Sequence, residues 1–453
     1  MDLPKELVRE SLPLPDVSEP TLTRHYTALA HRNFGLDSGF YPLGSCTMKY
    51  NPKSCERLGR VSGVTNLHPL TPEAFVQGAL ALMVELQEAL AEVTGLGDFS
   101  LQPCAGAHGE ATGLWIMRAF HQDQGARERT EILVPDTAHG TNPASSALAG
   151  FTIKSIKSAP DGRVNLAALE AALGSQTAGI MLTNPNTLGL FEPDILQITK
   201  LVHEAGGLAY YDGANLNAVM GYARPGDMGF DVCHVNLHKT FATPHGGGGP
   251  GSGPVGVTKN LARFLPTPRL AVREGTYSLD WGDDCSIGKV QAFWGNFLVL
   301  VRALAYIRAV GGSGLKAASE QAVLNANYLK KLLEPRLPMP YGPLCMHEFV
   351  ASAEELKHQR DVGAKEFGKR LLDYGFHAPT VYFPTLVHEA LMFEPTETER
   401  LELLDFFATI VGELLDEAER SPEVIKNAPH NMVVSALDEL GAARNLRLTW
   451  DMD

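Results

Sequence analysis

The stretch that decides the fold runs from residue 208 to residue 241 and reads LAYYDGANLNAVMGYARPGDMGFDVCHVNLHKTF. It contains two short apolar runs, 208–212 and 231–236, and each ends at a polar residue. Upstream, apolar runs at 131–135 and 178–183 alternate with a helical pattern at 194–205, which two glycines close. Such alternation predicts a parallel sheet with right-handed crossovers, covered by helices.

The rest of the chain predicts an arm and a second, smaller unit. Residues 1–70 are rich in Pro, Gly and isolated aromatics with little periodicity, which is typical of an arm lying on another surface. Helical patterns and one or two strands follow residue 320. We therefore expect an arm over 1–70, a large α/β domain over 71–312 and a small α+β domain over 313–453. The boundary is expected near the GGSGL stretch at 311–315.

Two helices are predicted with defined bounds. A helix over 72–93 would take Thr71 as its N-cap and Pro72 in its first turn. A long helix over 289–310 would bridge the two domains.

Charge and composition exclude several classes of protein. The formal net charge of −14 argues against a nucleic-acid partner, which needs a basic face. The opening MDLPKELVRE has no apolar segment of a secretory signal, and the apolar stretch 79–93 has the spacing of a packed amphipathic helix, so no membrane association is expected. The six cysteines form no Cys-x-x-Cys pair, which favours reduced thiols. We expect a soluble cytoplasmic protein.

Ligands of open α/β sheets bind beyond the carboxyl ends of the strands, so polar residues there are the candidates. The turn 105–110 (AGAHGE) leads into an apolar helix over 111–120, and its small residues would let backbone N–H groups approach a phosphate. A tight turn without a ligand is the alternative. Asp212 ends one apolar run, where a buried carboxylate needs a partner; a cap on the next turn is its alternative.

Lys239 follows the second apolar run, where a lysine rarely lies without a purpose. Burial there favours the neutral amine that forms an imine, whereas a snorkelling lysine would send its amine to water. The glycine-rich run PHGGGGPG at 244–251 suggests close backbone approach or freedom to move. It is not a Walker loop, because no Gly-Lys-Ser/Thr follows.

His139 follows the run at 131–135 and could stack on a ring or move protons, although a loop histidine with a structural partner is the commoner case. Pyridoxal phosphate needs a phosphate cradle, a ring cover, an acid for the ring nitrogen and an imine lysine. All four requirements occur in order in one α/β stretch. A metal site at Cys233, His234 and His238 is not expected, because neighbouring strand residues point to opposite faces and no further ligand motif accompanies them.

Long strings of the sequence resemble the glycine decarboxylase family, the P-proteins of the glycine cleavage system. They are FYPLGSCTMKYNPK (40–53), AGAHGEATGL (105–114), AHGTNPASSALAGF (138–151), YYDGANLNAVMG (210–221) and DVCHVNLHKTFATPHGGGGPGSGPVGV (231–257). They span most of the chain in order. The length resembles the subunit of the two-subunit form that carries pyridoxal phosphate.

The resemblance implies the fold type I architecture of aspartate aminotransferase, with pyridoxal phosphate on Lys239, Asp212 at the pyridine nitrogen and His139 on the ring. The implied cofactor-binding set also includes the turn and further polar neighbours: Ala105, Gly106, Ala107, His108, Asn184 and Thr240. Lys239, His139 or His238 would move the proton, and the sequence does not choose among them. The segment Ser45-Cys46-Thr47 would line the substrate entrance near a partner subunit.

The resemblance also implies the reaction. Glycine would lose carbon dioxide, and its aminomethyl group would pass to the lipoyl disulfide of the H protein, as in glycine dehydrogenase (aminomethyl-transferring), an oxidoreductase acting on CH–NH2 donors. Glycine dehydrogenase subunit 1 is the implied partner, in a heterotetramer of two of each subunit.

Two rival readings share some of these features. A stand-alone amino-acid decarboxylase or transaminase would use the same lysine and aspartate. A non-catalytic scaffold subunit would need neither of them.

Overall fold

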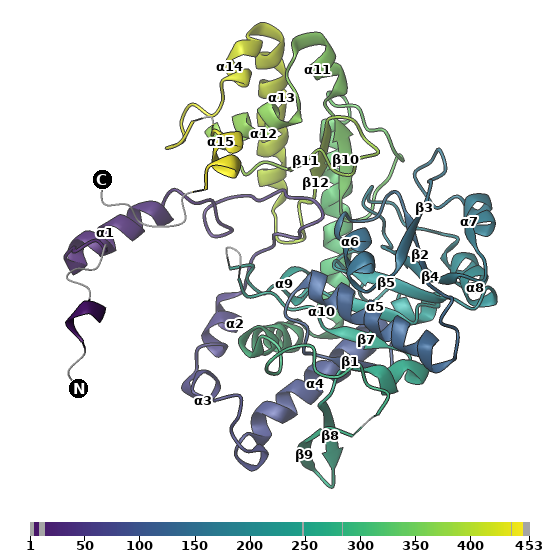
Figure 1. Cartoon of the computed structure of the whole chain (residues 1–453). Helices are drawn as coiled ribbons and strands as arrows, with labels where there is room; N and C mark the ends of the chain where they lie inside the picture. Colours follow the sequence, from purple (N-terminus) through teal and green to yellow (C-terminus); the bar gives the residue numbers. More distant parts are fainter. Residues whose placement is uncertain (1–3, 9–13, 247–248, 283, 436, 447–453) are drawn as a thin grey trace.

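The structure is a computed structural model that describes residues 4–8, 14–246, 249–282, 284–435 and 437–446. A large α/β unit occupies one half of the molecule and a smaller unit, rich in helices, occupies the other (Figure 1). The N-terminal arm runs between them before it enters the large unit.

A mixed sheet forms the centre of the large unit. In the described part of the chain its strand order is β1-β7-β6-β5-β4-β2-β3, and β2 to β6 pair in parallel with one another. β7 runs antiparallel to both β6 and β1. The strands are β1 Asp98–Ser100, β2 Glu131–Pro135, β3 Thr152–Ile156, β4 Thr177–Leu182, β5 Leu208–Gly213, β6 Val232–Val235 and β7 Val255–Val257. The predicted parallel sheet is therefore confirmed.

Helices cover both faces of this sheet because successive strand residues alternate between two apolar cores. Tyr210 packs with Met117 of α5 on one face, whereas Tyr211 packs with Leu90 of α4 on the other. The helices of this unit are α4 Gln77–Thr94, α5 Gly106–Asp123, α6 Thr141–Leu148, α7 Leu166–Ala172, α8 Ile195–Glu204 and α9 Leu237–Thr240, with short 3-10 turns at Pro225–Met228 and Lys259–Phe264. A hairpin of β8 Arg269–Arg273 and β9 Thr276–Asp280 projects from the body (Figure 1).

The small unit is an antiparallel sheet covered by helices. Its strand order is β10-β12-β11, and its core is rich in phenylalanine, including Phe349, Phe393 and Phe407. The elements are β10 Phe349–Ser352, α11 Glu354–Arg360, α12 Ala364–Asp373, β11 Thr380–Val381, β12 Ala390–Phe393, α13 Leu401–Arg420, α14 Pro422–Lys426 and α15 Glu439–Arg444.

One long helix, α10 (Phe297–Leu333), connects the two units. Its first half packs into the core of the large unit and its second half into the core of the small one. It is long and apolar enough to cross a membrane by composition, but these contacts make it an interior helix. The expected boundary at 311–315 falls inside α10, where Gly311 (φ 65°) interrupts the helical conformation. The division of the chain into three parts stays a prediction.

The arm contains mostly short helices: a 3-10 turn at Lys5–Leu7, α1 Glu19–Ala30, α2 Lys53–Leu58 and α3 Ser62–Thr65. A 3-10 turn at Glu73–Phe75 follows it. α1 stands away from the body, and none of its residues is buried (Figure 1). By contrast, the segment 40–49 passes between the two units and contains fully buried side chains.

Several predicted bounds were wrong. The helix expected over 72–93 is a short 3-10 turn followed by α4, whose N-cap is Val76, so Thr71 and Pro72 precede it. The helix expected over 289–310 begins only at Phe297. Lys239 lies in the one-turn helix α9 and not at the end of a strand. The spacing of apolar side chains predicts where a helix or strand lies, but it does not predict the residues at which that element begins and ends.

Close packing of α5 on the sheet gives a stability prediction. A Cβ on Gly113 would meet the Tyr210 ring and approach Val232 Cγ1 at 2.9 Å. Gly113→Ala should therefore lower the free energy of unfolding by about 1–3 kcal/mol. In the control Gly78→Ala, a helical glycine with open space around it, the same change should stabilise by up to about 1 kcal/mol. Equal shifts of the two thermal midpoints would contradict this packing.

Candidate active site

A cavity of about 420 Å³, called here the inner cavity, lies beyond the carboxyl ends of β4, β5 and β6. Its walls come from the sheet, the arm and the small unit. The described lining residues that carry the argument are Ser45, Cys46, Gly106, Ala107, His139, Asp212, Asn236, His238, Lys239, His347 and Glu348. Residues from three separate parts of the chain therefore enclose one space, as expected for a ligand site in an open α/β sheet.

Lys239 contributes the amine of this cavity. β6 ends at Val235, and the single turn of α9 that follows carries Lys239 into the lining. The side chain is largely buried, with 9% exposure, and Nζ donates a hydrogen bond of 2.8 Å to the carbonyl oxygen of Ser45. The amine is therefore held inside the molecule and not extended to water.

Asp212 contributes a buried carboxylate at the end of β5. It accepts hydrogen bonds from Asn142 Nδ2 (2.7 Å) and from the Ala214 amide (3.0 Å), and His234 Nε2 lies 3.3 Å from Oδ1. Burial would raise the pKa of Asp212, but His234 and these hydrogen bonds outweigh it and hold the pKa below its ordinary value. The carboxylate therefore stays ionised, as a partner for a protonated ring nitrogen must.

The first turn of α5 contributes backbone amides. Gly106 and Ala107 line the cavity at the N-terminus of this 18-residue helix. A Cβ on Gly106 would meet Asn236 Nδ2 at 2.7 Å, so only glycine allows this approach. Asn236 is buried, and its Oδ1 has no hydrogen-bond partner among the described residues. The glycine turn and the helix dipole together fit a phosphate group.

His139 contributes an imidazole wall. Its Nδ1 lies 2.7 Å from the Thr141 hydroxyl, which in turn donates to Glu110 (2.6 Å). The edge of Phe383, from the small unit, meets the ring at a centroid distance of 5.6 Å and an angle of 64°. Burial, more than any neighbouring charge, lowers the pKa of His139, so the ring is neutral at pH 7. A fixed, uncharged ring of this kind can cover a flat ligand.

The arm closes the cavity through residues 44–49. The Ser45 amide donates to Glu348 Oε2 (2.7 Å), and the Thr47 hydroxyl donates to Glu394 Oε1 (2.7 Å). Lys49, fully buried, pairs with Glu397 at 2.7 Å. Ser45 adopts φ 63°, a left-handed conformation that is uncommon for a residue with a side chain. The small unit therefore fixes the carbonyl that holds Lys239.

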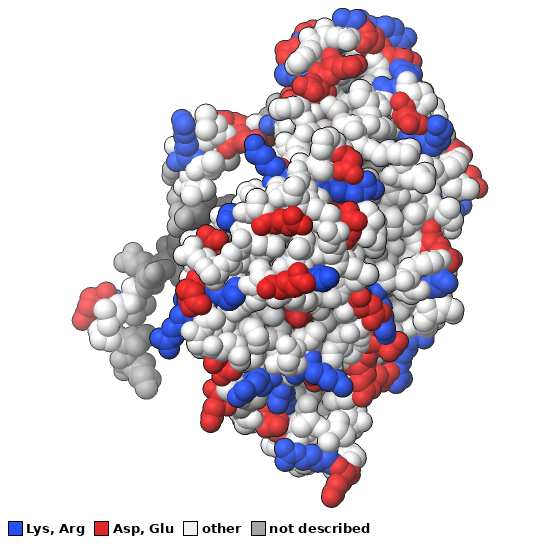
Figure 2. All heavy atoms as spheres, turned by 90° about the vertical axis from the view of Figure 1, so that its right-hand side faces the viewer, with Lys and Arg blue, Asp and Glu red and all other residues white. Residues whose placement is uncertain are grey.

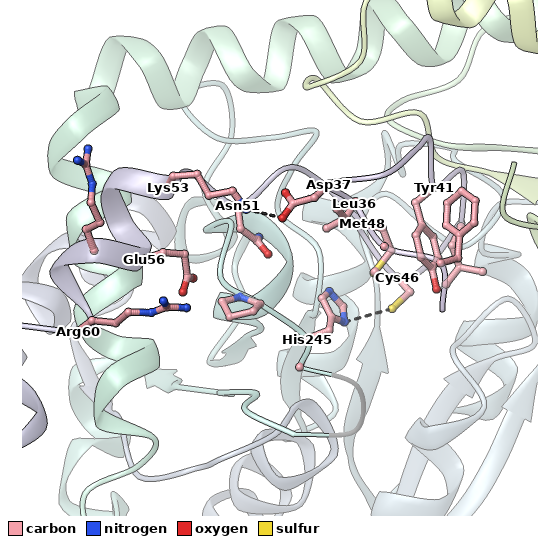
Figure 3. Close-up of a pocket in the computed structure, with 16 residues that line it drawn as sticks. Leu36, Asp37, Tyr41, Cys46, Met48, Asn51, Lys53, Glu56, Arg60 and His245 are labelled. Carbon is pink, nitrogen blue, oxygen red and sulfur yellow. Dashed lines mark hydrogen bonds and ion pairs between the residues drawn. The ribbon is translucent and has the colours of Figure 1, made fainter. Parts of the chain in front are cut away.

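Cys46 lies between the inner cavity and a second one of about 810 Å³, the outer cavity, and lines both (Figure 3). His245 Nε2 donates to the Thr47 carbonyl (3.3 Å), so its Nδ1 is free to face Cys46 Sγ at 3.8 Å. Burial raises the pKa of the Cys46 thiol. The outer cavity has apolar walls that include Leu36, Tyr41 and Met48, and charged residues also line it: Asp37, Lys53, Glu56, Arg57 and Arg60.

Not every residue that the sequence pointed to lines the inner cavity. The Asn184 side chain bonds to the backbone of Glu192, and Thr240 Oγ1 accepts from the Leu216 amide. Neither lines it, nor do Ala105 and His108, which flank the glycine turn. Their cofactor roles stay predictions. Two glycines of the run at 244–251, Gly247 and Gly248, lie outside the described residues.

Several lining residues were not predicted from the sequence, including His347, Glu348 and Phe383. His347 and Glu348 directly precede the buried strand β10, so a polar pair before an apolar run was a usable signal. Their place in the cavity could not be predicted because they lie far along the chain from the strands that form it. The small unit meets the sheet only in the folded molecule.

The residues present fit pyridoxal phosphate. A glycine turn that a Cβ would fill, an ionised carboxylate at Asp212 and a buried amine at Lys239 surround a single cavity. These groups match the phosphate, the ring nitrogen and the aldehyde of that cofactor.

Comparisons with known proteins support this reading. The model of the glycine cleavage system P-protein family matches residues 2–274, and that of the glycine dehydrogenase C-terminal domain matches residues 318–436. A probable glycine dehydrogenase (decarboxylating) subunit 2 from Caldanaerobacter subterraneus subsp. tengcongensis is 58% identical, covering 99% of this chain and 92% of that relative. A protein of the same name from Desulforamulus reducens is 56% identical, covering 99% and 93%.

Solved structures agree on the fold. A crystal structure of glycine decarboxylase (P-protein) of the glycine cleavage system, in inhibitor-bound form, aligns with a TM-score of 0.75 at 22% identity, covering 91% of this chain and 93% of that one. An aspartate aminotransferase from Thermus thermophilus aligns with a TM-score of 0.60 at 15% identity, covering 83% and 99%. The fold is therefore the fold type I architecture expected from the sequence, and the chain belongs to the glycine cleavage system P-protein family.

Proposed function

We propose that the chain is the cofactor-bearing subunit of a glycine decarboxylase. It removes carbon dioxide from glycine and passes the aminomethyl group to the lipoyl disulfide of the H protein. The observation that carries the proposal is the inner cavity, where Lys239, Asp212 and the glycine turn of α5 meet in a chain of this family.

Each of the cavity residues has a distinct part in holding the cofactor. Lys239 supplies the amine that carries it, Gly106 and Ala107 supply amides for its phosphate, and His139 covers its ring. When bound, pyridoxal phosphate accepts the electron pair left on the substrate as carbon dioxide departs. Asp212 supports that chemistry because an ionised carboxylate keeps the ring nitrogen protonated.

The proton is best moved by Lys239. Burial, together with His245 and Lys239, lowers the pKa of His238 to about 3, and the Ser252 amide occupies its Nδ1 at 3.2 Å. His139 is also neutral, and its Nδ1 is occupied by Thr141. Neither imidazole is a cation at pH 7, so neither can give up a proton as an imidazolium. The Lys239 amine, by contrast, is placed in the cavity by the Ser45 carbonyl and, as the amine that would hold the cofactor, would be the base that moves the proton.

The outer cavity suits the incoming acceptor. A lipoyl arm is a long apolar chain that ends in a disulfide, and the apolar walls formed by Leu36, Tyr41 and Met48 lead to Cys46 at the edge of the inner cavity (Figure 3). Charged residues of the same lining can meet the polar surface of the protein that carries the arm.

Glycine dehydrogenase subunit 1 is the proposed partner, in a heterotetramer of two of each chain. The relatives are named as subunit 2, and α1 stands free of the body with Leu22 and Tyr26 exposed. We assign the enzyme to the cytoplasm, since among the described residues Cys46, Cys55, Cys104, Cys233 and Cys345 are free thiols. On the face shown in Figure 2, acidic and basic side chains are interspersed, which gives no single-sign field for steering.

The first prediction concerns Asp212. Asp212→Asn should still bind pyridoxal phosphate, seen by its absorbance, but should lower glycine-dependent release of carbon dioxide on the order of 10²-fold because the ring nitrogen loses its charge partner. Asp231→Asn is the control, since it removes a carboxylate just before β6, at the opposite end of the sheet. Near-normal turnover in Asp212→Asn would reject the role.

The second prediction concerns the outer cavity. Leu36→Glu places a charge in its apolar wall and should lower kcat/KM for the lipoylated H protein about tenfold or more, with the cofactor spectrum unchanged. Leu58→Glu, at an exposed site on the arm that does not line the cavity, should change neither. If both variants have the same kcat/KM for the lipoylated H protein, the lipoyl arm does not enter through the outer cavity.

The function itself is tested by release of labelled carbon dioxide from glycine carrying the label in its carboxyl group. Release that needs this chain, subunit 1 and the lipoylated H protein together would support the proposal. Full release without the H protein would identify a stand-alone decarboxylase. No release with all three present would overturn the proposal.

A further inference from the structure

The inner cavity has an end that the proposed cofactor contacts do not use. It is formed by His347, Glu348, Thr380 and Phe383 of the small unit, next to the arm residue Ser45. None of the described residues that line the cavity is an arginine. A substrate with a carboxylate must nevertheless place that group somewhere in the cavity, and a buried anion needs donors.

His347 is the unpartnered group at this end. Its side chain is 3% exposed, and neither Nδ1 nor Nε2 has a hydrogen-bond partner among the described residues. Glu348 Oε1 lies 3.7 Å from its Nε2. Because both nitrogens are buried and unpartnered beside the cavity, the ring has hydrogen-bonding capacity for a polar group that enters there.

Glu348 lies beside it and belongs to a pair of buried acids. Its Oε2 accepts the Ser45 amide, and its partner Glu394 accepts from Thr47 and from Asn215 while its own Oε2 stays unpartnered. Two adjacent carboxyl groups so deeply buried cannot both ionise at low cost. Burial and the nearby Glu394 raise the pKa of Glu348 well above its ordinary value, and burial raises the pKa of Glu394 to about 7.

At neutral pH these groups are donors without charge. Burial and the neighbouring Lys239 lower the pKa of His347 to about 3, so it offers one N–H as a neutral ring. A protonated Glu348 offers one O–H. Both line the same cavity as Lys239.

We infer that His347 and Glu348, with Ser45 beside them, form a carboxylate recess that receives the acidic group of the amino-acid substrate through two uncharged donors. The inference rests on the proposed function and assigns the substrate's carboxylate to one end of the same cavity. Neutral donors hold the anion without the strong stabilisation that an arginine fork would give. The carboxylate is thus bound, but its negative charge is only weakly stabilised, and this favours its loss as neutral carbon dioxide.

The recess should respond to pH. The charged and titratable groups that face the acid pair are Lys239 of α9, His347, and Glu397, which is itself paired with Lys49 of the arm. Below pH about 7 the pair keeps its proton and admits an anion. As pH rises above 7 the pair loses that proton, becomes anionic and repels a second carboxylate. Affinity for a carboxylate-bearing ligand should therefore fall with rising pH.

Two aminooxy probes test this without turnover or H protein. Aminooxyacetate carries a carboxylate, and O-methylhydroxylamine does not, but both react with the bound cofactor, which stopped-flow absorbance follows. The ratio of their second-order rate constants isolates the contribution of the carboxylate. In the wild-type holoenzyme this ratio should fall between pH 6.5 and 8.5 in buffers of equal ionic strength.

Substitutions identify the residues responsible. His347→Leu should lower the ratio about tenfold at pH 6.5 by removing a hydrogen bond to an anion, with the O-methylhydroxylamine rate unchanged. His121→Leu is the matched control, because His121 is an equally buried imidazole that bonds to Ala178 outside the cavity. Glu394→Gln removes the acid whose pKa is raised to about 7, so the pH-dependent fall should disappear. Calorimetry of glycine binding in two buffers should show proton uptake at pH 7.5 in the wild type and less in Glu394→Gln.

The outcomes separate clearly. An unchanged ratio in His347→Leu, or an equal loss for both probes, would overturn the recess. A wild-type pH profile in Glu394→Gln would also overturn it. Because neither measurement involves release of carbon dioxide, failure of the proposed function in the labelled-glycine assay is distinguishable from failure here.

Discussion

The hydrogen bond from the Lys239 amine to the Ser45 carbonyl is the contact on which the site depends. It joins the carboxyl edge of the parallel sheet to the arm, and the same arm residue is held by Glu348 of the small unit through its amide. Three parts of the chain thus meet at one buried amine. The left-handed backbone of Ser45 is tolerated because hydrogen bonds on both sides determine its position.

The carboxyl groups around this amine differ in their state of ionisation. Asp212, supported by His234 and by Asn142, stays ionised where the ring nitrogen is expected, whereas burial and mutual repulsion keep Glu348 protonated at the wall formed by the small unit. Imidazoles between them are neutral because they are buried. Carboxyl groups of the same chemistry therefore serve opposite purposes, one as a fixed anion and the other as a neutral donor, and the surroundings decide which.

Sequence reasoning reached the large sheet, the fold type and the expected positions of Lys239, Asp212 and His139, because their signals are local: short apolar runs that end at polar residues. It failed at the ends of helices such as α4 and α10, where capping and tertiary contacts decide the bounds. It also missed His347 and Glu348, which reach the cavity only because the small unit folds back over the sheet through α10. Such long-range contacts leave no periodic trace in the sequence.

We propose that Lys239 is the lysine that carries pyridoxal phosphate in this chain. Borohydride reduction of the holoenzyme, followed by proteolysis and mass spectrometry, tests this assignment because reduction fixes the cofactor to the lysine that holds it. We expect a pyridoxyl label on the peptide that contains Lys239 and no label in Lys239→Ala. A label on another lysine, such as Lys49, which is buried against Glu397, would show that the assignment to Lys239 is wrong.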